Sequence, residues 1–189
     1  MFHRAVTASH RLFFALVPPI VLARRIAHAA SWFDGEGTAV AADRLHLTLF
    51  ILDDLYDVPS PLLATLRDVG AAIAAAPIDI VLDRVGGGPA SIALRPGRKI
   101  AALDALYDQL ATLCRRAGMA PRTGHAFSPH MTLGYRSGAP FSAAVTPVAW
   151  TARDMVLIHS HLGRTRHDRV GRWPLAKPEP QLALFDDNE

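Results

Sequence analysis

Two short stretches of the chain each hold a histidine and a threonine separated by one apolar residue. They are His46-Leu47-Thr48-Leu49 and, 84 residues later, His130-Met131-Thr132-Leu133. Alternate side chains of an extended strand share a face, so in each copy the histidine and threonine point one way and the two apolar residues the other. The pattern therefore predicts two strands, each with one face for a core and one for a cleft.

The two histidines suit metal-free acid–base chemistry at phosphorus. The ordinary pKa of histidine lies near neutrality, so one imidazole can act as general base while the other acts as general acid. Opening a cyclic phosphodiester needs both roles on opposite sides of phosphorus, and hence on two strands. A threonine two residues further along lies about 6–7 Å away on the same face. Its hydroxyl can donate a hydrogen bond to a phosphate oxygen as charge builds there.

A single His-x-Thr would carry little weight, because nine histidines in 189 residues make one accidental copy common. The two copies are the only ones in the chain, and both end in leucine within apolar runs. The alternative is that each pair is an ordinary surface pair or a satisfied core pair. The repetition favours the catalytic interpretation.

Length and composition bound the class of protein. A chain of 189 residues and 20.4 kDa, half of it hydrophobic and a fifth charged, suits one domain or two fused lobes. The single cysteine, Cys114, excludes an intramolecular disulfide and favours a reducing, cytoplasmic location. The apolar run at 12–23 is broken by two prolines and followed by two arginines, which argues against a secretory signal, and no run has the length of a membrane span.

The charge is concentrated in the first 176 residues. Residues 177–189 hold one lysine and four acidic residues, so residues 1–176 carry 19 basic and 13 acidic residues. The segment 153–172 is the most arginine-rich. Such a face suits a phosphorylated partner, although a solvated arginine-rich surface is the simpler alternative.

The apolar spacing predicts an α+β chain. Strands are expected at 12–17, 46–52, 78–85, 91–94, 130–135, 145–150, 155–161 and 170–175, and helices at 20–30, 61–75 and 100–118. Strand, helix and motif strand thus occur twice in that order, which indicates a weak internal duplication. The glycine run 86–88 is expected to be a hairpin turn, because no Lys-Ser/Thr pair follows to make it a phosphate loop.

Four stretches spread over about residues 11–175 carry a family resemblance. They are Arg11-Leu12-Phe13-Phe14-Ala15-Leu16, Leu45-His46-Leu47-Thr48-Leu49-Phe50, Phe127-Ser128-Pro129-His130-Met131-Thr132-Leu133 and Arg172-Trp173-Pro174-Leu175. On these residues the chain resembles the two-histidine phosphoesterase superfamily, and within it the bacterial RNA 2′,3′-cyclic phosphodiesterase (2′-5′ RNA ligase) family. The paired motif is the most specific part of the resemblance.

The resemblance implies a two-lobed fold, in which two antiparallel sheets face across a central cleft with one His-x-Thr strand in each lobe. It implies hydrolysis of a 2′,3′-cyclic phosphate on RNA or nucleotide ends to a 2′-phosphate, without metal or cofactor, and 2′-5′ RNA ligation as the reverse reaction. His46 and His130 are implied as acid and base, in an order that the sequence does not settle, with His46 favoured as the acid. Thr48 and Thr132 are implied as phosphate binders, and a monomer is expected.

Substrate contacts outside the two motifs are less well defined. His167 stands where relatives often have tyrosine, and Tyr135 where many have arginine. Phe50 and Tyr135, at the ends of the motif strands, are expected to stack on bases, since single-stranded RNA is read by stacking. Four other large aromatics are expected in the core; they are Phe13, Phe14, Trp150 and Trp173.

A metal site is the rival interpretation of one further histidine pair. His159 and His161 alternate along a predicted strand, share a face and can bind one ion. A third ligand is not obvious, since the nearest carboxylates in the sequence are Asp154 and Asp168. We expect a basic rim here and no metal site.

Residues 177–189 are expected to form a flexible acidic tail after a catalytic domain at 1–176. Within the tail, Gln181, Leu182, Leu184 and Phe185 resemble the pentapeptide by which bacterial proteins dock on the DNA sliding clamp. An apolar tail that packs on its own domain is the alternative. Beside the enzyme, a non-catalytic RNA or nucleotide binder and a clamp-recruited adaptor therefore stay open as functions.

Overall fold

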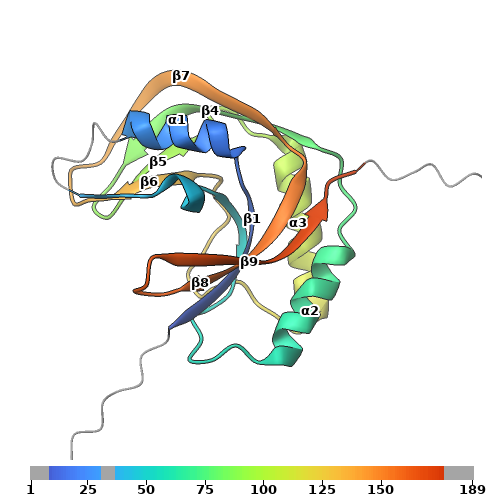
Figure 1. The fold of residues 1–189 in the computed structure, drawn as a ribbon. Helices are drawn as coiled ribbons and strands as arrows, with labels where there is room; N and C mark the ends of the chain where they lie inside the picture. The colour runs from blue at the N-terminus through green and yellow to red at the C-terminus, as the bar shows by residue number, and fades with distance from the viewer. Residues whose placement is uncertain (1–8, 31–36, 177–189) are drawn as a thin grey trace, which may run out of the picture.

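The helices and strands follow one another largely as the apolar spacing predicts, in a computed structural model that describes residues 9–30 and 37–176 (Figure 1). The helices are α1 (Ile20–Ala30), α2 (Ser60–Ala71) and α3 (Ala101–Arg116), with a short 3₁₀ turn, η2 (Ala42–Arg44), before the first motif strand. The strands are β1 (His10–Leu16), β2 (Thr38–Ala39), β3 (Leu47–Ile51), β4 (Ile78–Gly87), β5 (Ile92–Arg95), β6 (Met131–Tyr135), β7 (Phe141–Ala152), β8 (Asp154–His161) and β9 (Arg166–Pro174). Every predicted element has a counterpart, whereas β2 and η2 are too short to leave a periodic pattern.

Helix α2 ends at Ala71, four residues before its predicted end. The backbone of Ala74 is instead held by the side chain of Gln109 on α3, with the Ala74 N–H donating to Oε1 at 3.1 Å. Pro77 follows, and the residue before a proline is driven away from helical backbone angles. The alanine-rich segment after Ala71 is therefore not helical and connects α2 to β4.

The strands form a sheet whose order is symmetric about its centre. The order is β7-β4-β5-β6-β3-β1-β8-β9, with β2 paired to β6. The motif strands β3 and β6 are the two central neighbours. Each motif strand also pairs with an earlier strand, β3 with β1 and β6 with β5. In both cases a helix lies between the two paired strands in the sequence. The internal duplication indicated by the sequence is thus visible in the topology.

The helices cross between the two halves of the sheet. Helix α1 contacts β6, and α3 contacts β3, so each helix packs on the motif strand of the other half. Helix α2 packs beside α3 and against β8 and β9 (Figure 1). This exchange holds the two motif strands in a fixed relation to each other.

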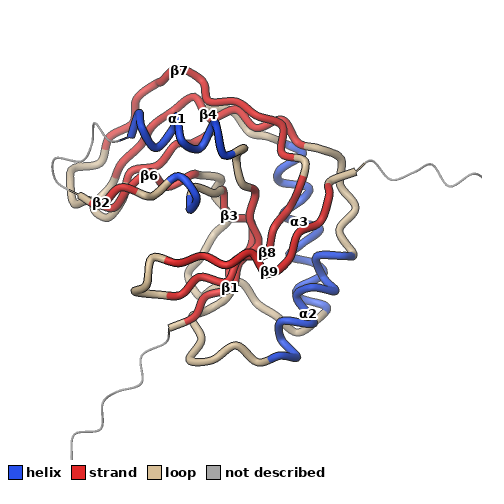
Figure 2. The backbone as a smooth tube through the Cα atoms, viewed as in Figure 1, coloured by secondary structure: helices blue, strands red, loops and turns tan. Residues whose placement is uncertain are grey.

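The two lobes are halves of one sheet, which differs from the expectation of two separate sheets. Strands β3 and β6 are joined by a single register pair, Leu47 with Met131. Away from this pair the halves diverge, and Figure 2 shows the β8–β9 hairpin projecting on the same side as β2. The sequence pattern could not reveal this pairing, because alternation defines the faces of a strand but not its neighbour.

The main core joins the apolar strand faces to the inner faces of the helices, and a second, smaller cluster of Phe13, Ala15, Val156 and Ile158 lies on the other face of β1 and β8. The buried stripe of α3 consists of Leu103, Leu106, Leu110 and Cys114. Burial raises the pKa of the Cys114 thiol to about 12, which leaves it unreactive. The expected core aromatics Phe13, Phe14 and Trp150 are buried, and Trp173 packs against the core while partly exposed.

Within the described residues, no helix is both long enough and apolar enough to cross a membrane. The expected tail at 177–189, with its clamp-like Gln181, Leu182, Leu184 and Phe185, lies outside the residues that the structure describes. Its role stays a prediction.

Candidate active site

The four motif residues gather where the two halves of the sheet meet. Leu47 pairs with Met131, and both side chains are fully buried on the helix-covered face. In antiparallel register this pair sets His46 opposite Thr132 and His130 opposite Thr48, all on the other face. Directly opposite residues lie about 4.5–5.5 Å apart at Cβ and diagonal ones about 7–8 Å. The two histidines are therefore the diagonal members of one compact set.

Each motif strand carries a β-bulge at the leucine that ends its motif. On β3, Thr48 pairs with Ala15 and Phe50 with Phe14, so Leu49 is the extra residue. On β6, Thr132 pairs with Ala93 and Gly134 with Ile92, so Leu133 is the extra residue. A bulge of this kind bends a strand and re-aims the side chains beyond it. The repeated leucine of the motif thus marks a repeated bulge, and each threonine stands beside a small alanine.

Both catalytic candidates are held by the same local hydrogen bond. Nδ1 of His46 donates to the carbonyl oxygen of Arg44 at 2.6 Å, and Nδ1 of His130 donates to that of Ser128 at 2.6 Å. A carbonyl can only accept, so each bond places the proton on Nδ1 of the neutral ring. Nε2 of both rings is then free to take or give a proton.

His46 is neutral in the free protein at pH 7. Burial lowers its pKa to about 4, although the carbonyl of Arg44 favours the charged ring and acts in the opposite direction. His167, His130 and Arg44 add smaller repulsions that lower the pKa further. The influence of His130 reflects the proximity that the strand register predicts.

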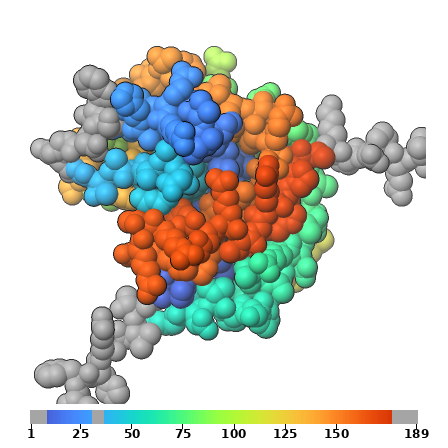
Figure 3. All heavy atoms as spheres, viewed as in Figure 1, coloured from blue at the N-terminus to red at the C-terminus, as the bar shows by residue number. Residues whose placement is uncertain are grey.

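A cleft of about 340 Å³ opens on this face. Among the residues that line it are His46, Thr48, Thr132, Tyr135, Arg44 and His167. In Figure 3, the segment before β3 (cyan) and the β8–β9 hairpin (orange) meet across this face of the molecule. His130 is not among the residues that line this cleft, and the register sets it opposite Thr48.

His167 lies beside His46, where the sequence analysis expected a substrate contact. The two rings meet edge to face with centroids 5.5 Å apart, and Phe13 packs against both, at 4.8 Å from His46 and 5.7 Å from His167. Burial, followed by the charge of Arg44, lowers the pKa of His167. His167 lines the cleft, and its Nδ1 is buried without a hydrogen-bond partner among the described residues.

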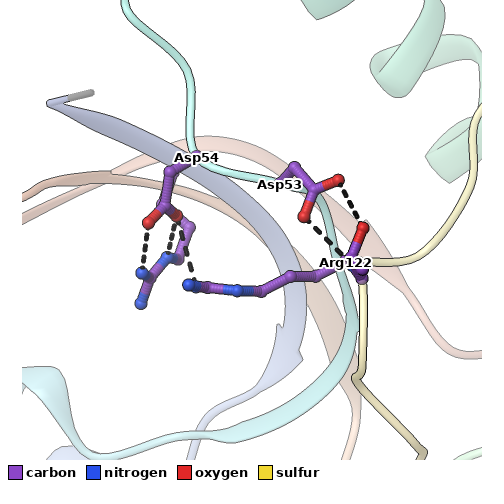
Figure 4. A network of polar contacts seen from close by, with 5 residues as sticks. Asp53, Asp54 and Arg122 are labelled. Atoms are coloured by element: carbon purple, nitrogen blue, oxygen red, sulfur yellow. Dashed lines mark hydrogen bonds and ion pairs between the residues drawn. The ribbon is translucent and has the colours of Figure 1, made fainter. Parts of the chain in front are cut away.

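The chain segment that leads to His130 is tied to the end of β3 by two aspartates. The N–H of Arg122 donates to the carbonyl of Ile51 at 2.7 Å, and Asp53 accepts from the backbone and hydroxyl of Thr123. Asp54 accepts two bonds from Arg11, at 2.6 and 2.7 Å, and one from Arg122 at 3.3 Å (Figure 4). Asp54 therefore links β1, the end of β3 and the approach to β6.

Replacing Asp54 by asparagine is expected to destabilise the fold by about 1–2 kcal/mol near pH 7, because it removes a charged, bidentate and partly buried pair. The hydrogen bond from Arg11 lowers the pKa of Asp54 below its ordinary 3.8. This stabilisation is present above that value and is lost as the pH falls through the lowered pKa. Urea unfolding of both proteins near pH 7 and near pH 3 measures the difference. Asp57→Asn, at an exposed position nearby, is the control. A difference that grows toward acid pH would contradict the pairing.

A comparison of the sequence with known protein families matches a region that contains both motifs. The sequence model of the 2′-5′ RNA ligase superfamily matches residues 18–169, most of the chain and both motifs. The chain belongs to the 2′-5′ RNA ligase superfamily. No curated protein sequence matches it significantly.

Solved structures place this superfamily member among phosphoesterases. E. coli LigT in complex with 3′-AMP superposes with a TM-score of 0.75 at 26% identity, over 89% of this chain and 99% of that one. A crystal structure described as a phosphoesterase gives 0.72 at 26% identity, over 89% and 99%. TT0787 of Thermus thermophilus gives 0.71 at 21% identity, over 88% and 98%, which shows the shared fold alone. The matches support an enzyme of the two-histidine phosphoesterase class, as the sequence resemblance implied.

The prediction that Phe50 of this superfamily member contacts the substrate is wrong. Phe50 is 1% exposed and belongs to the core, so it cannot stack on a base. The bulge at Leu49 turns Phe50 to the helix-covered face, where it pairs with Phe14. Tyr135, which follows the equivalent bulge in β6, is 57% exposed and lines the cleft. Its expected role in stacking stays a prediction.

Sequence reasoning missed three cleft residues. Arg11 and Arg166 line the cleft but are paired with Asp54 and Asp168, whereas Arg44 acts electrostatically on both His46 and His167. The only sequence signal for Arg44 was its position two residues before the motif histidine. Ser128 stands at the same offset before His130, which is the spacing that the two anchoring carbonyls require.

Proposed function

We propose that this protein hydrolyses 2′,3′-cyclic phosphates on RNA or nucleotide ends to 2′-phosphates, by acid–base catalysis with His46 and His130 and without a metal ion. The observation that supports it best is the matched pair of imidazoles, each with Nδ1 bound to a carbonyl two residues earlier and Nε2 left free. A binding protein has no need for two imidazoles prepared in this way.

The symmetry of the site fits the geometry of the reaction. In-line attack at phosphorus requires a base on the side of the entering water and an acid on the side of the departing oxygen. The central Leu47–Met131 pair relates the two halves of the sheet, so the two histidines approach a phosphate held between them from opposite sides. Thr48 and Thr132 lie between them and can donate hydrogen bonds to the non-bridging oxygens.

The order of acid and base depends on the bound phosphate. An anion held against His46 favours its charged form and raises its low pKa toward neutrality. Substrate binding thus favours the protonated form of His46. His46 is then the acid that protonates the 3′-oxygen as it leaves. His130 is the base that removes a proton from water, and this is the order favoured by the sequence analysis.

The cleft beyond the phosphate site suits a nucleoside. Arg44 brings positive charge close to His46, where the phosphate would bind. Tyr135 offers an exposed ring for stacking, and His167 lines the cleft beside His46. The similar E. coli LigT was crystallised with 3′-AMP, and we extend to this chain the inference that a nucleotide binds in the cleft. Ligation of RNA ends through a 2′-5′ bond would be the reverse reaction at the same site.

An oligoribonucleotide that ends in a 2′,3′-cyclic phosphate tests the proposal. Incubated with the full chain and an excess of chelator, it is expected to give a 2′-phosphate end and no 3′-phosphate, with many turnovers per chain. Product identity is read by chromatography against synthetic standards of both isomers. Circular dichroism in the same buffer shows that the chain stays folded in chelator.

The control is the double variant His46→Ala, His130→Ala, purified in parallel to measure contaminating ribonuclease. Equal activity in the wild-type and double-variant preparations would contradict the proposal. Loss of activity in chelator, while the protein stays folded, would also contradict it. Tight binding of the cyclic end without turnover would favour the non-catalytic binder instead.

A further inference from the structure

Three histidines meet at the end of the sheet where β1 begins. His10 on β1 pairs in register with His161 on β8, and His159 stands two residues from His161 on the same face. One nitrogen from each ring lies within 4.8 Å of one from each of the other two. The sequence offered only His159 and His161 and left their third partner unidentified.

The rings are close enough to share one ligand. Nδ1 of His10 and Nε2 of His159 are 2.8 Å apart, and the centroids of the His159 and His161 rings are 4.2 Å apart. Two nitrogens bound to the same tetrahedral zinc ion, at Zn–N distances of about 2.0–2.1 Å, stand about 3.3 Å apart. Widening the His10–His159 contact by about half an ångström, with the proton between them moved to the other nitrogen of its ring, would let both nitrogens bind one ion.

A carboxylate orients the third ring. Nε2 of His161 is 2.8 Å from Oδ2 of Asp168, and Arg166 donates to Oδ1 of the same carboxylate at 2.8 Å. A histidine that binds a metal through one nitrogen commonly donates its other N–H to a carboxylate, which fixes the ring and increases its basicity. His161 would then bind through Nδ1, with Asp168 as its outer partner.

We infer that His10, His159 and His161 form a binding site for one divalent transition-metal ion of the zinc type, with a water molecule as fourth ligand and Asp168 orienting His161. Three imidazoles favour zinc and its neighbours over magnesium or calcium, which prefer oxygen ligands.

The location argues for a stabilising role rather than a catalytic one. Strand alternation puts Leu12 and the three histidines on one face of β1 and β8, and Phe13 and Ser160 on the other, toward the cleft. Only His161, at the hairpin end, also reaches the rim of the cleft. The ion would join β1 to the β8–β9 hairpin, whose opposite face carries His167 beside His46. It would steady that hairpin without contacting phosphate.

Zinc and cobalt binding by the untagged full chain tests the inference. After chelator treatment and dialysis, isothermal titration with Zn²⁺ is expected to give one ion per chain, and Co²⁺ the intense visible absorption of a tetrahedral nitrogen site. His10→Ala and His161→Ala should each weaken Zn²⁺ binding by at least roughly 100-fold. Asp168→Asn should weaken it by roughly 10- to 100-fold, the usual effect of removing an outer-sphere partner.

The control is His28→Ala, which removes an exposed histidine on α1, away from the cluster. This variant should bind Zn²⁺ as tightly as the wild type does. Circular dichroism shows whether each variant is folded. If an alanine variant does not fold, the conservative variant Asp168→Asn still tests the site. Zn²⁺ affinity that is equal in wild type and the cluster variants, or no binding by the wild type, would overturn the inference. Since the readout is metal binding, it does not depend on whether the cleft hydrolyses cyclic phosphates.

Discussion

Replacing His46 or His130 by alanine is expected to lower the turnover number for a 2′,3′-cyclic phosphate by roughly 10²- to 10⁴-fold in each case, the usual contribution of a positioned acid or base. Each change removes the Nε2 atom that moves a proton, while the motif side chains in the core, Leu47, Leu49, Met131 and Leu133, are unchanged. Single-turnover rates with a cyclic-phosphate oligonucleotide measure the loss.

The two losses should not add. When acid and base serve one transition state, the double variant is expected to be about as slow as the slower single variant. The Michaelis constant should change little, because phosphate binding rests on Thr48, Thr132 and the cationic groups around them. His28→Ala, on the exposed side of α1, is the matched control and should keep full activity. A His130→Ala protein that retains more than about a tenth of the wild-type rate would show that this histidine is not the base.

The sequence predicted the faces of the motif strands correctly, because a period of two is set by the strand itself. The apolar Leu47 and Met131 are buried, and the polar Thr48 and Thr132 line the cleft. The long helix at Ala101–Arg116 was equally plain, since its leucines keep a helical period over about three turns. In these elements the local pattern and the final packing agree.

The failures lie where one strand meets another. Phe50 was expected to stack on bases because it lies at the end of a motif strand. Strict alternation would put it on the face of His46 and Thr48, but a bulge at Leu49 breaks that alternation. Nothing local distinguishes a bulged strand from a regular one, since the extra residue is defined by its partner strand. The single sheet and the third histidine, His10, escaped prediction for the same reason, because both depend on register between strands far apart in the chain.

The repeated bulge also explains why the motif is longer than its chemistry requires. Acid–base catalysis uses the histidine and the threonine, yet both copies end in leucine. Leu49 and Leu133 are the extra residues of two equivalent bulges, and both are buried on the helix-covered face. The leucine therefore buries the extra residue of each bulge in the core, and the same arrangement occurs in both halves.

His46 is expected to titrate near pH 4 in the free protein and closer to neutrality when phosphate is bound. Burial holds its free pKa about two and a half units below the ordinary 6.5. The unfolded chain takes up a proton on His46 as the pH falls through 6.5, whereas the folded chain resists until about 4. Stability contributed by His46 is thus complete above pH 6.5 and is lost between 6.5 and 4, up to about 3 kcal/mol. Urea unfolding of wild type and His46→Gln across this range should show the wild type losing more.

The phosphate-bound state decides whether His46 can be the acid. A bound anion within about 4–6 Å stabilises imidazolium and should raise the pKa by roughly 1–3 units, which makes the charged ring accessible near pH 7. Nuclear magnetic resonance of the imidazole groups, with His46→Gln to assign the signal, measures the titration with and without inorganic phosphate. By linkage, phosphate must then bind more tightly as the pH falls through this range, which an independent affinity measurement checks. A pKa that stays near 4 with phosphate bound would leave His46 neutral at pH 7, and would assign it the role of base and His130 that of acid.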